Sequence, residues 1–304
     1  WKIFGLYRNQ KMITIKPSLV LKPNDLILVI GKPEVLMQVY NVIGKTQGQF
    51  PMPFGSNIYL YLDLYFEDEN SVRKAIEEAK YLNQKLKNNL LIVRITRPTT
   101  VEIMDFIKSE LKYFPTINLI IDYSNKGFAK IIKEDSRKNN IGMIMLTSEM
   151  FKNKENTKSV MELKIPVFKF GKEKLKSIKR TVIVLNDTNS YEQISPIVFD
   201  ISSQLKVKTK IFDLDPIGEK DGKSTLLDHF ENLAKIFNEK LEVVTSGENP
   251  IRELKKQRNM LQILPLKDEM FKKRFSFKFL YTNSDFIAFD MNKFNQLLIP
   301  IVEE

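Results

Sequence analysis

Along residues 58–304, apolar and polar positions follow the order of strands succeeded by amphipathic helices. Residues 58–66 form an apolar run, residues 67–71 a polar turn, and residues 72–87 place apolar side chains every three or four positions. This spacing predicts a strand, a turn and a helix with one apolar face. Strands that alternate with such helices predict a parallel sheet. The apolar positions of the helix are Val72, Ala75, Ile76, Ala79, Leu82 and Leu86.

The same unit occurs twice in the chain. Residues 181–185 form a second apolar strand, residues 186–190 a second Asn/Asp/Ser turn, and a helix follows to about residue 205. Agreement in order, spacing and termini predicts a tandem duplication. We therefore expect two α/β domains with parallel sheets, 58–170 and 178–304, related by an approximate two-fold axis. Later strands also pair between the copies: 117–121 with 241–245, 142–146 with 260–264, and 165–167 with 299–301, the last two both apolar-Pro-apolar.

The opening segment, residues 1–46, has a different pattern. Short apolar runs at residues 2–6, 12–15 and 26–30 predict three strands, separated by polar or Pro-containing turns. Pro33 stands at a position that the first turn of a helix tolerates, so a helix is predicted over residues 34–42. We expect a small β-rich unit.

Composition excludes several classes of protein. The 304 residues contain no cysteine and one histidine, which excludes disulfides and Cys-ligated metal sites and argues against a His-dependent triad. Lysines are scattered along the chain, so the net charge of +11 does not indicate nucleic-acid binding. No apolar run approaches the roughly 20 residues that span a bilayer. Because the chain begins at Trp1, we expect a fragment of a longer cytosolic protein.

The opening segment resembles the RCK_C (TrkA-C) domain of bacterial potassium transport and channel proteins. The residues that carry the resemblance are Leu6-Tyr7-Arg8-Asn9, Ile15-Lys16-Pro17, and the stretch from Asn24-Asp25 through the apolar strand to Gly31-Lys32-Pro33-Glu34-Val35-Leu36. Asn24 replaces the usual glycine, and the family's first strand and helix would precede Trp1. The resemblance implies a TrkA-type regulator that forms a homodimer through this segment. It also implies a membrane cation-transport subunit as partner.

Both α/β copies resemble the universal stress protein fold. The stretch from Val182 to Asp187, with Ser203-Gln204-Leu205-Lys206-Val207, carries the resemblance, as does the closing Leu298-Ile299-Pro300-Ile301. ATP-binding members have a Gly-x2-Gly-x9-Gly-Ser/Thr stretch after strand four, where glycine lets backbone N–H groups approach phosphates. Here residues 147–152 and 265–269 contain no glycine. We therefore expect the fold with weak or absent ATP binding.

Candidate ligand-binding residues come from one feature of parallel sheets. Ligands bind outside the carboxyl ends of the strands, at the point where strand order reverses. The residues predicted there are Glu67, Asp68, Thr147, Ser148, Asn186 and Asp187. An alternative is that Asp68 and Asp187 only cap their helices.

Other polar residues are interpreted as structural. Asp213 and Asp215 fit a turn better than a metal pair, and His229 is expected at a surface or boundary. No motif pairs a nucleophile with a base. We predict no catalytic residue, no metal and no cofactor, and hence no enzyme.

The hypothesis is a cytosolic, non-enzymatic regulator of potassium or other monovalent-cation transport. It would act as a ligand sensor, with a small nucleotide among its candidate ligands. Such a sensor acts by binding two conformations with different affinity. The alternative is a nucleotide-binding protein like the universal stress proteins. A third interpretation is a scaffold in which the tandem pair only forms a pseudo-dimer.

Overall fold

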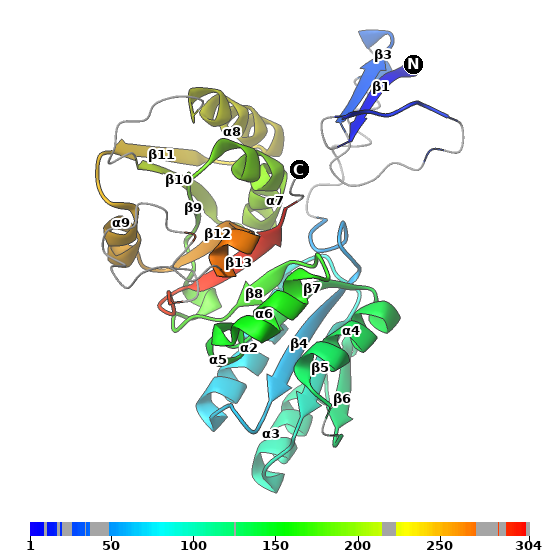
Figure 1. Ribbon diagram of the computed structural model, residues 1–304, viewed down its shortest axis with the longest axis vertical. Coiled ribbons are helices and arrows are strands. Elements are labelled where there is room, and N and C mark those ends of the chain that lie inside the picture. Colours follow the sequence, from blue (N-terminus) through cyan, green and yellow to red (C-terminus); the bar gives the residue numbers. More distant parts are fainter. Residues whose placement is uncertain are drawn as a thin grey trace. The chain divides into compact units, whose positions relative to one another are not determined.

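The computed structural model describes most of the chain (Figure 1). Contacts divide it into a small unit, residues 1–47, and a large unit, residues 48–301. No helix among the described residues has the length and apolar content needed to cross a membrane. The described residues are 1–8, 11–16, 19, 26–33, 35–36, 49–124, 126–214, 223–271, 285 and 290–301.

The small unit contains a three-stranded antiparallel sheet in the order β2-β1-β3. The strands are β1 (Lys2–Arg8), β2 (Lys11–Met12) and β3 (Leu26–Ile30). The three predicted strands are confirmed, although β2 stops at Met12 rather than at Ile15. Pro33 begins a helical turn, while most of the predicted helix 34–42 and the motif residues Pro17, Asn24, Asp25 and Glu34 lie outside the described residues.

The large unit is built on one ten-stranded sheet, β11-β10-β9-β12-β13-β8-β7-β4-β5-β6. Every neighbouring pair in it is parallel except β13 and β8. The strands of the first half are β4 (Asn57–Asp63), β5 (Leu91–Thr96), β6 (Ile117–Asp122), β7 (Ile141–Leu146) and β8 (Val167–Lys169). Those of the second half are β9 (Arg180–Val184), β10 (Lys208–Leu214), β11 (Leu241–Ser246), β12 (Met260–Leu266) and β13 (Asn295–Pro300).

The two halves meet at β8 and β13, the closing strands with the repeated apolar-Pro-apolar signature. They pair antiparallel, with Leu298 opposite Val167 and Gln296 opposite Lys169. We call this junction the seam. Outward from it, both halves have the same strand order, as an approximate two-fold axis requires. The sequence predicted two separate parallel sheets, and the structure joins them because each closing strand has a free edge that the other covers.

Helices cover both faces of the sheet, so the large unit has three layers. Along β4, Ile58, Leu60 and Leu62 pack on one face, while Tyr59 and Tyr61 pack on the other, as the two-residue period of a strand requires. The first face carries α2 (Glu69–Lys85), α3 (Val101–Leu111), α7 (Thr188–Leu205) and α8 (Lys223–Phe237) in one apolar core across both halves. The second carries α4 (Phe128–Asn139), α5 (Ser148–Lys152), α6 (Lys154–Met161) and α9 (Pro250–Lys256).

Candidate functional site

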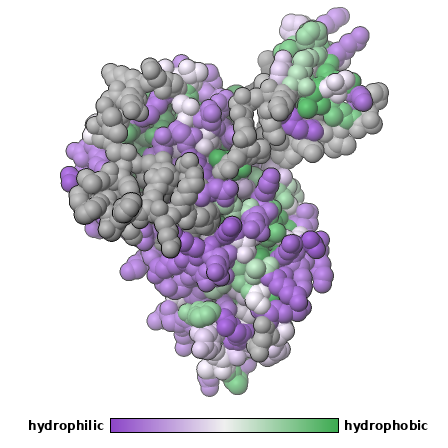
Figure 2. Space-filling view, in the orientation of Figure 1, coloured by the Kyte–Doolittle hydropathy of each residue, from purple (hydrophilic) through white to green (hydrophobic). Residues whose placement is uncertain are grey.

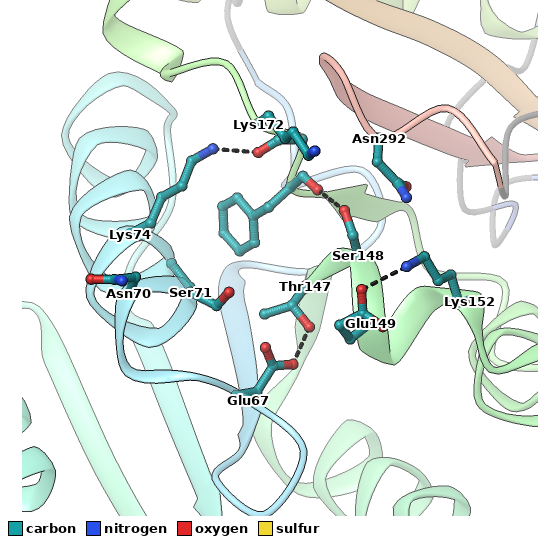
Figure 3. Close-up of a pocket in the computed structure, with 13 residues that line it drawn as sticks. Glu67, Asn70, Ser71, Lys74, Thr147, Ser148, Glu149, Lys152, Lys172 and Asn292 are labelled. Carbon is teal, nitrogen blue, oxygen red and sulfur yellow. Dashed lines mark hydrogen bonds and ion pairs between the residues drawn. The ribbon is translucent and has the colours of Figure 1, made fainter.

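The candidate site is a pocket at the switch point of the first half, between the carboxyl ends of β4 and β7. The chain leaves β4 toward β5 and β6 and returns on the other side through β7, so the loops after β4 and β7 diverge there. A cavity of about 460 Å³ lies between the start of α2 and α5 (Figure 3). It is lined by Glu67, Asn70, Ser71, Lys74, Ala75, Thr147, Ser148, Glu149, Lys152, Phe170, Gly171, Lys172 and Asn292.

Glu67 lies at one end of this pocket, just before α2. The Thr147 hydroxyl donates a hydrogen bond to Glu67 Oε1, and Thr147 also caps α5 by accepting from the Met150 N–H at 3.2 Å. Burial is the main reason that the pKa of Glu67 is raised to about 7. The hydrogen bond from Thr147 lowers this pKa, and the negative charge of Glu149 raises it. Near neutral pH this carboxyl group is therefore divided between its charged and neutral forms.

Three lysines bring positive charge to the pocket. Lys74, from α2, donates to the carbonyl oxygen of Gly171, and its pKa is lowered by burial. Lys152 lies 2.6 Å from Glu149 Oε1, which partly neutralises both groups. The ammonium group of Lys172 has no partner among the described residues, so it is available to an anion. Figure 3 shows these lysines around Ser148, whose hydroxyl donates to the Phe170 carbonyl at 2.5 Å.

The corresponding position of the second half carries a lysine of the chain itself. Lys267 follows β12 as Thr147 follows β7, and its ammonium group pairs with Asp187 and lies 3.6 Å from Asp285. Asp285 also accepts from Tyr191 at 2.8 Å and from Asn186 at 2.7 Å. Burial raises the pKa of Asp285 to about 6, while the Lys267 charge lowers it. The acidic groups of this switch point thus face a cation that the chain itself supplies.

The structure divides the six predicted site residues. Glu67, Thr147 and Ser148 line the pocket together. Asp68 instead caps α2, where it accepts from the Ser71 N–H at 3.0 Å. Asn186 and Asp187 belong to the cluster around Lys267, and Asp187 caps α7 by accepting from the Ser190 N–H at 2.8 Å. The capping role that the sequence suggested is therefore confirmed for both aspartates.

Sequence reasoning missed Lys74, Lys172 and Asn292. Lys74 follows Asn70 by four positions, so the helical period alone places it on the same side of α2. Lys172 and Asn292 come from the ends of the two seam strands and have no local signal. They reach the pocket because β8 and β13 pair.

Other candidate groups are structural. His229 Nε2 lies 2.8 Å from the Ser195 hydroxyl, but that hydroxyl already donates to the Glu192 carbonyl at 2.7 Å, so it joins α7 to α8. Asp213 lies 3.5 Å from Lys223, while Asp215 is outside the described residues. No group of three or more metal-ligating side chains occurs in the described part of the chain.

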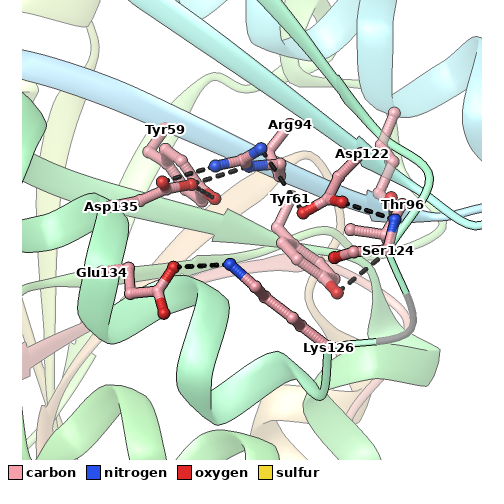
Figure 4. A network of polar contacts seen from close by, with 10 residues as sticks. Tyr59, Tyr61, Arg94, Thr96, Asp122, Ser124, Lys126, Glu134 and Asp135 are labelled. Atoms are coloured by element: carbon pink, nitrogen blue, oxygen red, sulfur yellow. Dashed lines mark hydrogen bonds and ion pairs between the residues drawn. The ribbon is translucent and has the colours of Figure 1, made fainter.

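A buried ionic network lies on the face of the sheet that α4 covers (Figure 4). Arg94, on β5, contacts Asp135, on α4, through two hydrogen bonds of 2.5 and 2.7 Å. The Tyr59 hydroxyl donates to the same carboxylate at 2.6 Å, and Asp122 lies 3.7 Å from the guanidinium group. These charges satisfy one another, so the network fixes α4 on the sheet.

Comparison with solved structures identifies the architecture of the large unit. A putative universal stress protein from Pseudomonas aeruginosa UCBPP-PA14 matches with a TM-score of 0.56 at 10% identity, covering 81% of this chain and 93% of that one. A universal stress protein from Archaeoglobus fulgidus DSM 4304 matches at 0.50 and 14% identity, with 81% and 97% covered. The large unit has the universal stress protein fold.

A transport protein shares this fold. The cytoplasmic domain of a prokaryotic cation chloride cotransporter matches with a TM-score of 0.50 at 12% identity, covering 80% of this chain and 95% of that domain. No protein-family model and no curated protein matches the sequence. At these identities the likeness shows the fold alone.

Proposed function

We propose that this chain is the cytosolic, ligand-sensing part of a potassium or other monovalent-cation transport system, and that it regulates transport without catalysing a reaction. The observation that carries the proposal is the pocket at the first switch point, which is lined by charged side chains of both signs. The resemblance of residues 6–36 to the RCK_C domain and the fold shared with a cotransporter's cytoplasmic domain support the transport role.

The two switch points differ in a way that suits a sensor. In the second, Lys267 pairs with Asp187, whereas the first leaves a cavity lined by unlike charges. A ligand that binds this cavity more tightly in one conformation of the transport assembly shifts the assembly toward that conformation. The membrane subunit would then respond to a signal received in this pocket.

The small unit supplies a surface for self-association. Hydrophobic residues gather on its described strands in Figure 2, in contrast to the mainly hydrophilic surface of the large unit in that view. Large apolar side chains left exposed in water favour association. We propose that a second copy of the chain covers them in a homodimer. The most exposed are Trp1 (61%), Phe4 (63%), Met12 (65%), Leu28 (49%) and Ile30 (55%).

Rubidium uptake by cells tests the transport role. A deletion of the gene is complemented by the full-length wild type, by Asn70→Trp, which places a bulky side chain at the rim of the pocket, or by Glu77→Trp on an exposed position of the same helix. We expect the deletion and Asn70→Trp to change the rate of uptake, and Glu77→Trp to behave as the wild type. Unchanged uptake in the deletion strain would refute the transport role.

The alternative function is nucleotide binding in the manner of a universal stress protein, which the fold favours. A triphosphate needs closely approaching backbone N–H groups, and the stretch after β7 offers Thr147, Ser148 and Glu149 instead of glycines. We expect calorimetric titration with Mg-ATP to give a dissociation constant weaker than micromolar. A micromolar or tighter constant would favour the alternative.

A further inference from the structure

We propose that the pocket between α2 and α5 binds a small organic phosphate that carries hydroxyl groups, and that this ligand bridges the seam between the two halves of the large unit. The inference rests on the ligand-sensing function proposed above and names the chemical class of the ligand. The volume of the pocket, about 460 Å³, falls in the usual range for small-molecule sites, about 300–1,000 Å³.

The phosphate is assigned to the side of the pocket where Lys74 and Lys172 meet Ser148. Lysine ammonium groups bind phosphate as point charges. Lys152 is already paired with Glu149, so Lys172 contributes a charge that no described carboxylate neutralises. The ammonium group of Lys74 donates one hydrogen bond to the Gly171 carbonyl and has two further N–H donors.

The hydroxyl groups are assigned from two acceptor atoms that lack donors. Glu67 Oε2 and Asn292 Oδ1 are buried, and neither has a hydrogen-bond partner in the described structure. Both residues line the pocket. Buried acceptors are normally satisfied, and an inorganic dianion such as sulfate brings no hydrogen to donate. A phosphate ester with hydroxyl groups supplies both the charge for the lysines and the donors for these oxygens.

The position of Asn292 makes the site belong to both halves. Asn292 precedes β13, and its carbonyl accepts from the Lys172 N–H at 2.8 Å. Next to it, the Gly171 N–H donates to Asn295 Oδ1 at 2.8 Å. A ligand that contacts α2 and Asn292 together therefore binds residues of both halves and stabilises their contact at the seam.

Gly171 lets two backbone segments approach each other closely at this side of the pocket. A Cβ atom there would lie 2.2 Å from the backbone of Phe294, which is far inside a van der Waals contact. The end of β8 and the start of β13 can therefore approach closely, and this brings Lys172 and Asn292 to the same cavity.

Calorimetric titration of the full chain with ribose 5-phosphate, ribose and inorganic phosphate tests the inference. We expect ribose 5-phosphate to bind about tenfold or more tightly than either of the other probes, because only it joins a charged phosphate to several hydroxyl donors on a carbon chain that can reach both unpaired oxygens. Lys172→Met is expected to weaken its binding about tenfold. The matched control is Lys176→Met, an exposed lysine outside the pocket, which should bind as the wild type does.

A second variant tests the bridge across the seam. Asn292→Ala removes one of the two unpaired oxygens and should reduce the preference for ribose 5-phosphate over inorganic phosphate, while inorganic phosphate still binds as in the wild type. If ribose 5-phosphate binds no more tightly than inorganic phosphate, or if Lys172→Met is without effect, the inference is wrong. The rubidium experiment stands apart from this result, because uptake can depend on the gene whichever ligand the pocket takes.

Discussion

Lys169 provides a quantitative test of the seam. Its side chain is fully buried on β8, where the ammonium group donates to the Met291 carbonyl and to Gln296 Oε1, both at 2.9 Å. Burial lowers the pKa of Lys169 from 10.5 to about 7, while the Asp290 carboxylate raises it and the Lys152 charge lowers it. The unfolded chain therefore holds this proton more tightly than the folded protein between pH 7 and pH 10.5.

The sign and size of the effect follow from proton linkage. Stability rises with pH wherever the unfolded state binds more protons, by at most about 1.4 kcal/mol per pH unit for one group. Titration of Lys169 should thus add about 2 kcal/mol to the free energy of unfolding between pH 7 and pH 9. Below pH 7 the lysine is charged in both states, and the full cost of burying the charge, about 5 kcal/mol, is present.

Lys169→Met isolates this contribution. Urea unfolding followed by circular dichroism at pH 6, 7, 8 and 9 should show that the variant lacks the rise of about 2 kcal/mol. Two oxygens lose their donor in the variant, at about 1–3 kcal/mol each, and this loss does not depend on pH. The stability of the variant relative to the wild type should therefore fall by about 2 kcal/mol from pH 7 to pH 9. Exposed Lys130→Met is the control, with the slope of the wild type. Equal slopes for Lys169→Met and the wild type would refute the reasoning.

Three further predictions concern other parts of the chain. Between pH 4.5 and pH 7 the wild type should lose at most about 3 kcal/mol of stability, because the folded protein holds the Glu67 proton to about pH 7 and the unfolded chain releases it near pH 4.5. Glu67→Gln should not show this loss, and urea midpoints that depend on pH identically in both proteins would contradict the prediction. Asp135→Ala leaves the buried Arg94 charge with only the more distant Asp122 carboxylate and should lower the free energy of unfolding by at most about 3–5 kcal/mol, whereas a loss under 1 kcal/mol would show that the pair is unimportant. Light scattering should find a dimer of the wild type and a monomer of Leu28→Lys/Ile30→Lys, and a monomeric wild type would exclude the homodimer.

The sequence alone determined the repeated strands and helices of this protein. Their apolar residues recur at the periods of a strand or a helix, and Asp68 with Ser71, like Asp187 with Ser190, identifies a helix start within a few residues. The three strands of residues 1–30 followed in the same way. These features depend on neighbours in the chain, so local pattern was sufficient.

Only the tertiary structure decided how the halves meet and which switch point has a pocket. The pairing of β8 with β13 joins residues more than a hundred positions apart, and it brings Asn292 to Lys172. Thr147 and Lys267 follow equivalent strands, yet one leaves a cavity beside Glu67 and the other fills its site with an ammonium group. These outcomes depend on side-chain length and on contacts between distant segments, which periodicity along the chain does not encode.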